Sequence, residues 1–137
     1  MRVRDAMSDA VLTIGPSHTL RDVAEAMCRR NVGAAVVLDP DAPGPAVITE
    51  RDILQAVGSG EDPDRELVGD HLTSSLTLAS PDWSLERAAA TMVRGSFRHL
   101  VVYDGAELAG ILSMRDIMRC WTRDGATSDV PAEAAQA

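Results

Sequence analysis

Thr49-Glu-Arg-Asp-Ile53 directly follows the apolar run Ala46-Val-Ile48, and the same pattern returns as Ser113-Met-Arg-Asp-Ile117 after a second apolar run. Upstream of each motif, residues 20–27 align with residues 85–92 at nearly the same offset. Self-similarity over this distance indicates two copies of one structural unit. The offset changes by a residue only in the loop between two predicted strands, where an insertion is tolerated. The repeat therefore organises the fold.

Each copy predicts the element order β-α-β-β-α. Apolar residues recur at Leu20, Val23, Ala24 and Met27 with the spacing of a half-buried helix, and Thr19 is the predicted N-cap. Ser84 has the same role in the second copy. The predicted strands are 12–14, 35–38, 46–49, 76–78, 100–103 and 108–113, and the predicted helices are 20–27, 50–57, 85–92 and 114–121. We assign residues 1–64 to the first repeat with its linker, 65–122 to the second repeat, and 123–137 to a disordered tail.

Composition excludes several classes of function. The net charge of −8 repels a phosphate backbone, and an aromatic content of 3% provides no stacking platform, so we expect no nucleic acid partner. All basic residues are arginine, which rules out a lysine nucleophile. The chain also has no nucleophile elbow, P-loop or dinucleotide fingerprint, and we expect that it is not an enzyme.

The sequence predicts neither a membrane span nor a metal site. Its apolar runs fall short of the roughly 18 residues that suggest a membrane span, and Cys28 and Cys120 form no C-x-x-C pair, so we expect a soluble cytoplasmic protein with reduced thiols. His18 and His71 lie near predicted turns without partners at ligand spacing, so we expect no metal. The polar segment 58–64 reads as a linker without function.

The Ser/Thr-x-x-Asp motif at a strand-to-helix junction has two interpretations. The first backbone N–H groups of a helix and its dipole favour a phosphate, to which Thr49 or Ser113 can donate, while Asp52 or Asp116 can accept from both hydroxyls of a ribose. The same atoms also make an N-cap with an acidic residue one turn later, which stabilises the helix by about 1 kcal/mol. Residues alone leave both interpretations open.

The two copies resemble a tandem pair of CBS domains of the stand-alone prokaryotic type, also called a Bateman module. The resemblance is carried by residues 3–7, 46–53, 68–72, 97–104 and 110–117. It implies an α+β fold of two β-α-β-β-α repeats packed as a pseudo-two-fold pair, which assembles as a homodimer. It also implies a non-catalytic sensor that binds an adenosyl ligand in clefts between the repeats and signals to a separate partner protein. The candidate ligands are AMP, ADP, ATP and S-adenosylmethionine, and no cofactor is required.

The resemblance assigns roles residue by residue. Thr49 and Ser113 match the positions that contact phosphate, and Asp52 and Asp116 match the positions that contact ribose. The complete candidate site is Ile14, Thr49, Arg51, Asp52, Leu78, Arg98, His99, Ser113, Arg115 and Asp116. Arg98 and His99 match basic residues that reach phosphates, whereas the first copy has Gly33 and Ala34 in their place.

Two further expectations concern partners. The alternative to a ligand sensor is a CBS-fold module that binds no ligand and serves in dimerisation or protein interaction. Some apolar surface of the second helices is expected to remain for another copy of the chain. The candidate residues are Ile53, Val57, Ile117, Cys120 and Trp121.

Overall fold

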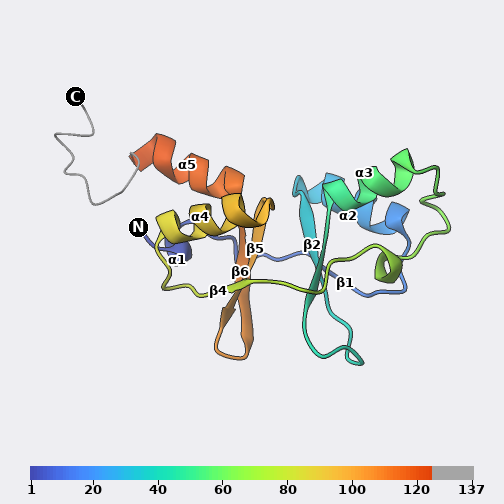
Figure 1. The fold of residues 1–137 in the computed structure, drawn as a ribbon, viewed down its shortest axis with the longest axis horizontal. Coiled ribbons are helices and arrows are strands. Elements are labelled where there is room, and N and C mark those ends of the chain that lie inside the picture. Colours follow the sequence, from blue (N-terminus) through green and yellow to red (C-terminus); the bar gives the residue numbers. More distant parts are fainter. Residues whose placement is uncertain (125–137) are drawn as a thin grey trace. The chain divides into compact units, whose positions relative to one another are not determined.

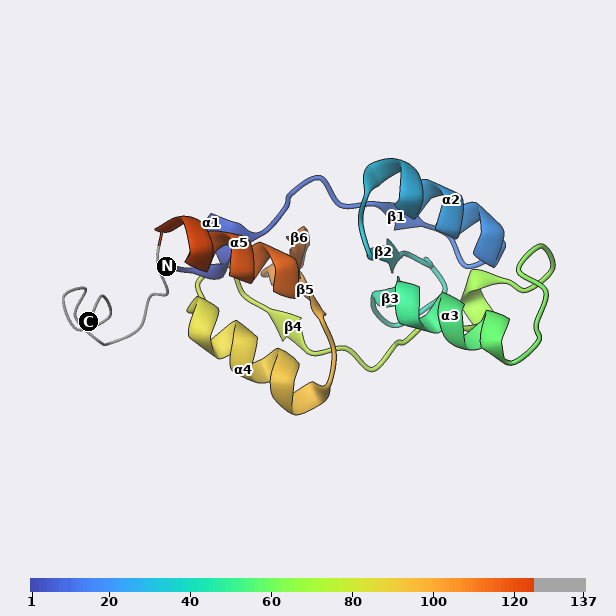
Figure 2. The same cartoon turned by 90° about the horizontal axis from the view of Figure 1, so that it is seen from above.

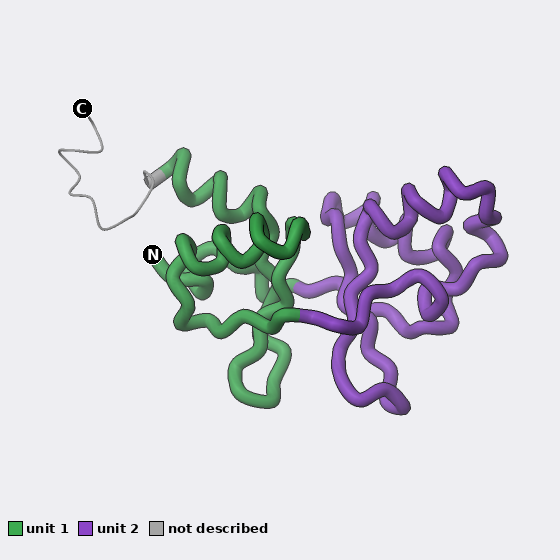
Figure 3. The backbone as a smooth tube through the Cα atoms, in the orientation of Figure 1, with its two compact units in different colours: residues 1–10, 77–137 green, residues 11–76 purple. Residues whose placement is uncertain are grey.

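The computed structural model describes residues 1–124 and divides into two compact units (Figure 3). Unit 2 is Val11–Leu76, and unit 1 combines Met1–Ala10 with the chain from Thr77 onward. Of the tail predicted for residues 123–137, residues 125–137 lie outside the described part of the chain. Within residues 1–124, no helix has both the length and the hydropathy that crossing a membrane requires.

Unit 2 is a three-stranded sheet with two helices. Its elements are β1 (Thr13–Ile14), α2 (Leu20–Arg30), β2 (Ala34–Val37), β3 (Ala46–Thr49), α3 (Glu50–Gly58) and a 3₁₀ turn η1 (Val68–Asp70). The strand order is β1-β2-β3, with β1 parallel and β3 antiparallel to the central strand. Helices α2 and α3 lie side by side on one face of this sheet (Figures 1 and 2).

Unit 1 repeats this arrangement. Its elements are α1 (Val3–Ala6), β4 (Leu78–Ala79), α4 (Leu85–Gly95), β5 (His99–Asp104), β6 (Glu107–Ser113) and α5 (Met114–Asp124). The strand order is β4-β5-β6, again parallel and then antiparallel. The prediction of an α+β fold built from two β-α-β-β-α repeats is confirmed.

Each unit has its own aliphatic core between helices and sheet. In unit 2 the core side chains are Leu20, Val23, Met27, Ala35, Val37, Ala46, Ile48, Ala56 and Val68. In unit 1 they are Val3, Ala79, Leu85, Ala88, Met92, Leu100, Val102, Leu112, Ile117 and Cys120. Thr19 and Ser84 cap α2 and α4 as predicted, each accepting a bond from the amide three residues later. Capping and the apolar stripe together explain why these residues form helices.

The opening segment of each copy packs into the unit formed by the other copy. The amide of Val3 donates to the Trp83 carbonyl at 2.8 Å, and Ser8 exchanges two backbone hydrogen bonds of 2.9 Å with Ile111. In unit 2, the amide of Val68 donates to the His18 carbonyl at 2.8 Å. Val3 and Val68 are both completely buried. The linear alignment of the repeats does not reveal this exchange.

The first strands of the two units, β1 and β4, correspond to each other with a shift of one residue from the alignment made on the sequence. Thr13 pairs with Val36 and Leu78 pairs with Val101, so Leu78 is the structural equivalent of Thr13. Ile14 corresponds instead to Ala79. A two-residue strand has too little side-chain alternation to set its own register, so the alignment of 12–14 with 76–78 is wrong by one position.

Candidate functional site

Thr49 and Asp52 form a reciprocal capping box at the start of α3. The amide of Thr49 donates to Oδ2 of Asp52 at 2.8 Å, and the amide of Asp52 approaches Oγ1 of Thr49 at 3.4 Å. The Thr49 hydroxyl also donates to Asp52 Oδ2 at 3.1 Å. Both side chains are half-buried, at the point where β3 ends and the helix begins. The strand-to-helix junction predicted from the motif is therefore present.

Ser113 and Asp116 have the same geometry at the start of α5. The amide of Ser113 donates to Asp116 Oδ2 at 2.8 Å, and the amide of Asp116 donates to Ser113 Oγ at 3.0 Å. The Asp116 side chain is 17% exposed, and its Oδ1 lies 3.7 Å from Nη1 of Arg119. An ionised carboxylate has about four acceptor positions, so the cap leaves acceptor capacity for a further donor such as a hydroxyl.

The two junctions differ in charge. In unit 1, Arg98 is exposed and its carbonyl accepts from the amide of Met114 at 2.8 Å, while His99 pairs with Ser113 across the strands. In unit 2, the carbonyl of Gly33 accepts from the amide of Glu50 at 3.0 Å. The Glu50 carboxylate lies 3.2 Å from the position that a Cβ on Gly33 would occupy. An acidic side chain therefore lies beside the first junction, whereas the residues whose backbones adjoin the second junction are basic.

Glu50 is a residue that the sequence analysis did not assign to the site. Its counterpart at the start of the other helix is Met114, and this difference in charge was visible in the aligned motifs. What the sequence did not show was that the Glu50 side chain turns back toward Gly33.

The structure does not bring all candidate residues of one unit together. Thr49 pairs with Ala34 at the start of β2, whereas Ile14 pairs with Val37 at its end. Ile14 instead lines a cavity of about 590 Å³ with residues of α2. In unit 1, Leu78 pairs with Val101, two positions along β5 from His99. Arg51 and Arg115 are exposed at the second position of their helices.

His71 has close partners, contrary to the expectation from its position in the sequence. Its Nε2 lies 2.8 Å from Oε1 of Glu66 and 3.0 Å from Oε2 of Glu61. These glutamates lie five and ten residues earlier in irregular chain, so no helical or strand spacing predicted the contacts. Glu61 belongs to the segment 58–64, which the sequence analysis treated as a linker.

Comparison with known proteins agrees with this architecture. The CBS domain family model matches residues 3–59 and 68–122. An uncharacterized protein of Methanocaldococcus jannaschii is 31% identical over 90% of this chain, which spans 44% of the length of that protein. The CBS domain-containing protein YhcV of Bacillus subtilis is 31% identical over 84% of this chain and 81% of its own length.

A solved structure supports the same assignment at the level of fold. A CBS domain protein of Pyrobaculum aerophilum in complex with AMP is 32% identical and superposes with a TM-score of 0.79. The match covers 93% of this chain and 100% of that one. With two family matches in the order of the two repeats, this chain belongs to the CBS domain family and contains two consecutive copies of the domain.

Proposed function

We propose that this chain is a non-catalytic regulatory module that binds an adenine nucleotide through Ser113 and Asp116 and passes its occupancy to a separate protein. The observation that carries the proposal is the strand-to-helix junction of unit 1. The hydroxyl and carboxylate of the motif lie there, next to the backbones of two basic residues at the start of the paired strand. AMP in the related Pyrobaculum aerophilum structure supports an adenosine monophosphate as the first ligand to test.

Charge favours the second junction for a phosphate. Arg98 and His99 precede or begin β5, beside Ser113, and the amino end of α5 adds the positive end of its dipole. Charge-assisted hydrogen bonds of this kind each contribute about 1.5–3 kcal/mol. At the first junction, the Glu50 carboxylate repels an anion. We therefore assign the nucleotide to the junction of unit 1, with its phosphate at Ser113 and its ribose at Asp116, and not to the junction of Thr49 and Asp52.

Coupling to a partner requires that the ligand bind two conformations of the module with different affinity. The proposed ligand contacts the first turn of α5. Two residues of this helix, Ile117 and Cys120, are part of the unit 1 core. Ligand occupancy is therefore connected by direct packing to the centre of that unit, which is the route we propose for the signal.

A homodimer is part of the proposal. Both units expose apolar side chains at equivalent helix positions, Leu54 and Met118 on the second helices and Cys28 and Val93 on the first. The exposed fraction is 71% for Leu54 and 58% for Met118. Helix surfaces that carry the same pattern in each repeat are suited to contact with a second copy of the chain related by two-fold symmetry. Of the residues expected at this surface, Ile117 and Cys120 are buried in the core instead.

The alternative is a module of the same fold that binds no ligand and acts through protein contacts. The specific observation in its favour is that both motifs are engaged in complete capping boxes. Under this alternative, Asp52 and Asp116 stabilise their helices and have no other role.

Thermal unfolding of the full chain with AMP, ADP, ATP, S-adenosylmethionine, NADH and GTP separates the two functions. At about 100 times Kd, one bound ligand adds about 2.7 kcal/mol and raises the midpoint by several degrees. We expect a shift with an adenine nucleotide that Asp116→Ala abolishes. Asp22→Ala is the matched control, because Asp22 caps α2 in the same way but lies in unit 2 and not at the unit 1 junction assigned to the nucleotide. A lack of response to every ligand would favour the ligand-free module.

A further inference from the structure

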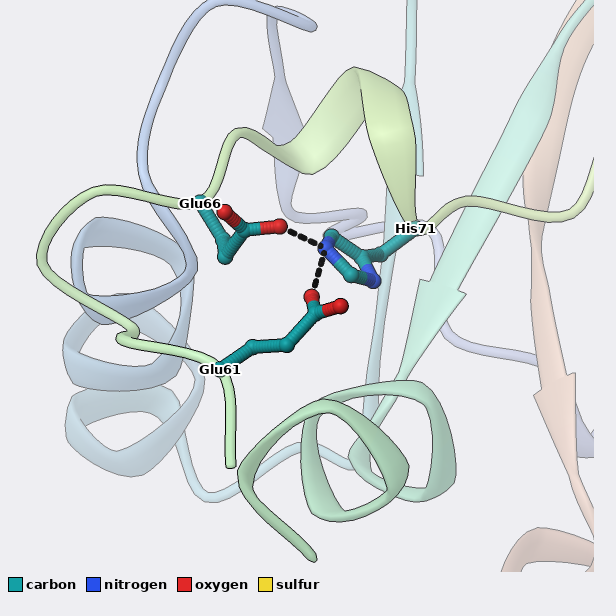
Figure 4. A group of neighbouring side chains, drawn as sticks. All are labelled: Glu61, Glu66 and His71. Atoms are coloured by element: carbon teal, nitrogen blue, oxygen red, sulfur yellow. Dashed lines mark hydrogen bonds and ion pairs between the residues drawn. The ribbon is translucent and has the colours of Figure 1, made fainter. Parts of the chain in front are cut away.

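Glu61, Glu66 and His71 converge on one point at the end of unit 2 that lies beyond α3 (Figure 4). Backbone hydrogen bonds hold all three residues in place. The amide of Glu61 donates to the Ala56 carbonyl at 3.0 Å, that of Glu66 to the Asp62 carbonyl at 2.9 Å, and that of His71 to the Val68 carbonyl at 3.1 Å. None of the three residues belongs to the proposed nucleotide site.

The contacts leave one nitrogen shared between two acceptors. Oε1 of Glu66 and Oε2 of Glu61 approach the same His71 nitrogen, at 2.8 and 3.0 Å (Figure 4). An imidazole nitrogen carries at most one proton, so it cannot donate fully to both carboxylates. A single divalent cation could be bound by all three atoms, which lie within 4.8 Å of one another.

The cluster also has an excess of negative charge. A hydrogen bond to Glu66, followed by burial and the charge of Glu66, raises the pKa of Glu61 above its ordinary value. The contact with His71 and then the bond to Glu61 lower the pKa of Glu66. Nearby arginines contact other carboxylates, with Arg21 paired to Asp64 and Arg65 lying 3.8 Å from Asp62. Among the described contacts, His71 is thus the residue that both glutamates contact.

We propose that Glu61, Glu66 and His71 form a divalent metal site, for which Zn²⁺ is the best-matched ion. One imidazole and two carboxylates are ligands that Zn²⁺ accepts, and three protein ligands leave a fourth position for water. At metal–ligand distances of about 2.0–2.1 Å, tetrahedral ligands are about 3.3 Å apart. The His71 nitrogen, at 2.8 and 3.0 Å from the two glutamate oxygens, needs to separate from each of them by only about 0.3–0.5 Å.

Burial is compatible with both selectivity and entry of the ion. The His71 side chain is 17% exposed and is held against the unit, whereas Glu66 is 35% and Glu61 41% exposed. The histidine therefore provides a fixed nitrogen, and the glutamates can adjust while the ion enters from solvent. A bound ion would join the loop that follows α3 to the residue that follows η1.

Zn²⁺ binding to the tag-free full chain tests the proposal. The protein is stripped of metal with a chelator, and stoichiometry is then measured by equilibrium dialysis and affinity by competition with a chromophoric chelator. Glu66→Gln and His71→Gln remove one ligand each, with circular dichroism confirming the fold. Two controls are matched to them. Asp62→Asn removes an acid of the same loop outside the cluster, and Cys28→Ser removes the exposed thiol.

We expect one Zn²⁺ per chain, unchanged affinity in both controls, and binding weakened at least about 100-fold in Glu66→Gln and His71→Gln, since loss of even an outer-shell partner costs 10–100-fold. The imidazole nitrogen resonances of His71, one of three histidines, should shift on addition of Zn²⁺ to the wild type. Absence of Zn²⁺ binding by the wild type, wild-type affinity in Glu66→Gln or His71→Gln, loss of binding in Cys28→Ser, or unshifted His71 resonances would each overturn the proposal. None of these results depends on a nucleotide.

Discussion

Replacement of Gly110 by alanine tests the packing of the N-terminal segment into unit 1. Gly110 is buried in β6, and a Cβ built on it would lie 2.6 Å from the carbonyl oxygen of Ser8. Ordinary contacts begin at 3.4 Å, so the two segments must separate by about 0.8 Å. Ser8 cannot move away freely, because its amide and carbonyl both bond to Ile111 at 2.9 Å.

The expected cost follows from these contacts. Weakening both backbone hydrogen bonds removes about 0.5–1.5 kcal/mol each, and overpacking of a filled site costs about 1–3 kcal/mol by itself. Because the two estimates describe the same distortion, they are not added together. We expect Gly110→Ala to lower the free energy of unfolding of unit 1 by about 1–3 kcal/mol. A loss of this size lowers the unfolding midpoint by roughly 4–8 °C per kcal/mol for a unit of this size.

Tryptophan fluorescence during urea unfolding reports unit 1 selectively, since both tryptophans, Trp83 and Trp121, belong to it. Gly58→Ala is the matched control. Gly58 is the last residue of α3 in unit 2, and its Cβ would contact nothing within 4 Å. The control should leave the fluorescence transition unchanged. A Gly110→Ala protein that unfolds at the wild-type urea concentration would refute the close approach of the N-terminal segment to β6.

Three other changes have defined outcomes. Ser96 is the C-cap of α4 and has a φ of 58°, a left-handed conformation that glycine adopts more readily than serine. Ser96→Gly should therefore raise the free energy of unfolding of unit 1 by about 0.5–1 kcal/mol in the same fluorescence assay, and an unchanged free energy would argue against the left-handed cap. Arg98→Ala should weaken AMP binding about 10–100-fold, because it removes a charged hydrogen bond, whereas Arg94→Ala on α4 should leave AMP affinity unchanged. An Arg98→Ala protein with the AMP affinity of the wild type would remove Arg98 from the site. If the chain is the proposed homodimer, Leu54→Asp combined with Met118→Asp should give a 14.6 kDa monomer in sedimentation velocity. A double variant that sediments as a dimer would exclude these two helix surfaces as the interface.

Local sequence signals predicted the four longer helices and the two junctions, but not the short helices α1 and η1. The stripe from Leu20 to Met27 and the cap at Thr19 act within a few residues of each other, and α2 begins at Leu20 as predicted. The structure continues it to Arg30, where Asn31 adopts a left-handed cap that the apolar stripe does not encode. Capping and periodicity are short-range effects, so the sequence reports them directly.

Long-range contacts were not predictable in the same way. The opening segments exchange units because Val3 and Val68 fill the core made by the other copy, and no local pattern specifies which core an apolar residue enters. The cluster around His71 has the same origin, since Glu61 and Glu66 reach it through the path of an irregular loop. The prediction of which apolar side chains of the second helices remain at the surface was wrong for α5. Ile117, expected at that surface, is in the core, and the neighbouring Met118 is exposed.

Direct measurement of AMP binding by titration calorimetry, for the wild type, Asp116→Ala and Asp22→Ala, tests the nucleotide site. The first two proteins differ in a carboxylate that both caps α5 and is proposed to accept from ribose. Asp22 caps α2 of unit 2 and lies 3.5 Å from Nδ1 of His18, outside the proposed site. We predict one AMP site that retains its affinity in Asp22→Ala and loses it in Asp116→Ala. Equal AMP affinity in all three proteins, or no AMP binding by the wild type, would contradict the assignment of AMP to Ser113 and Asp116.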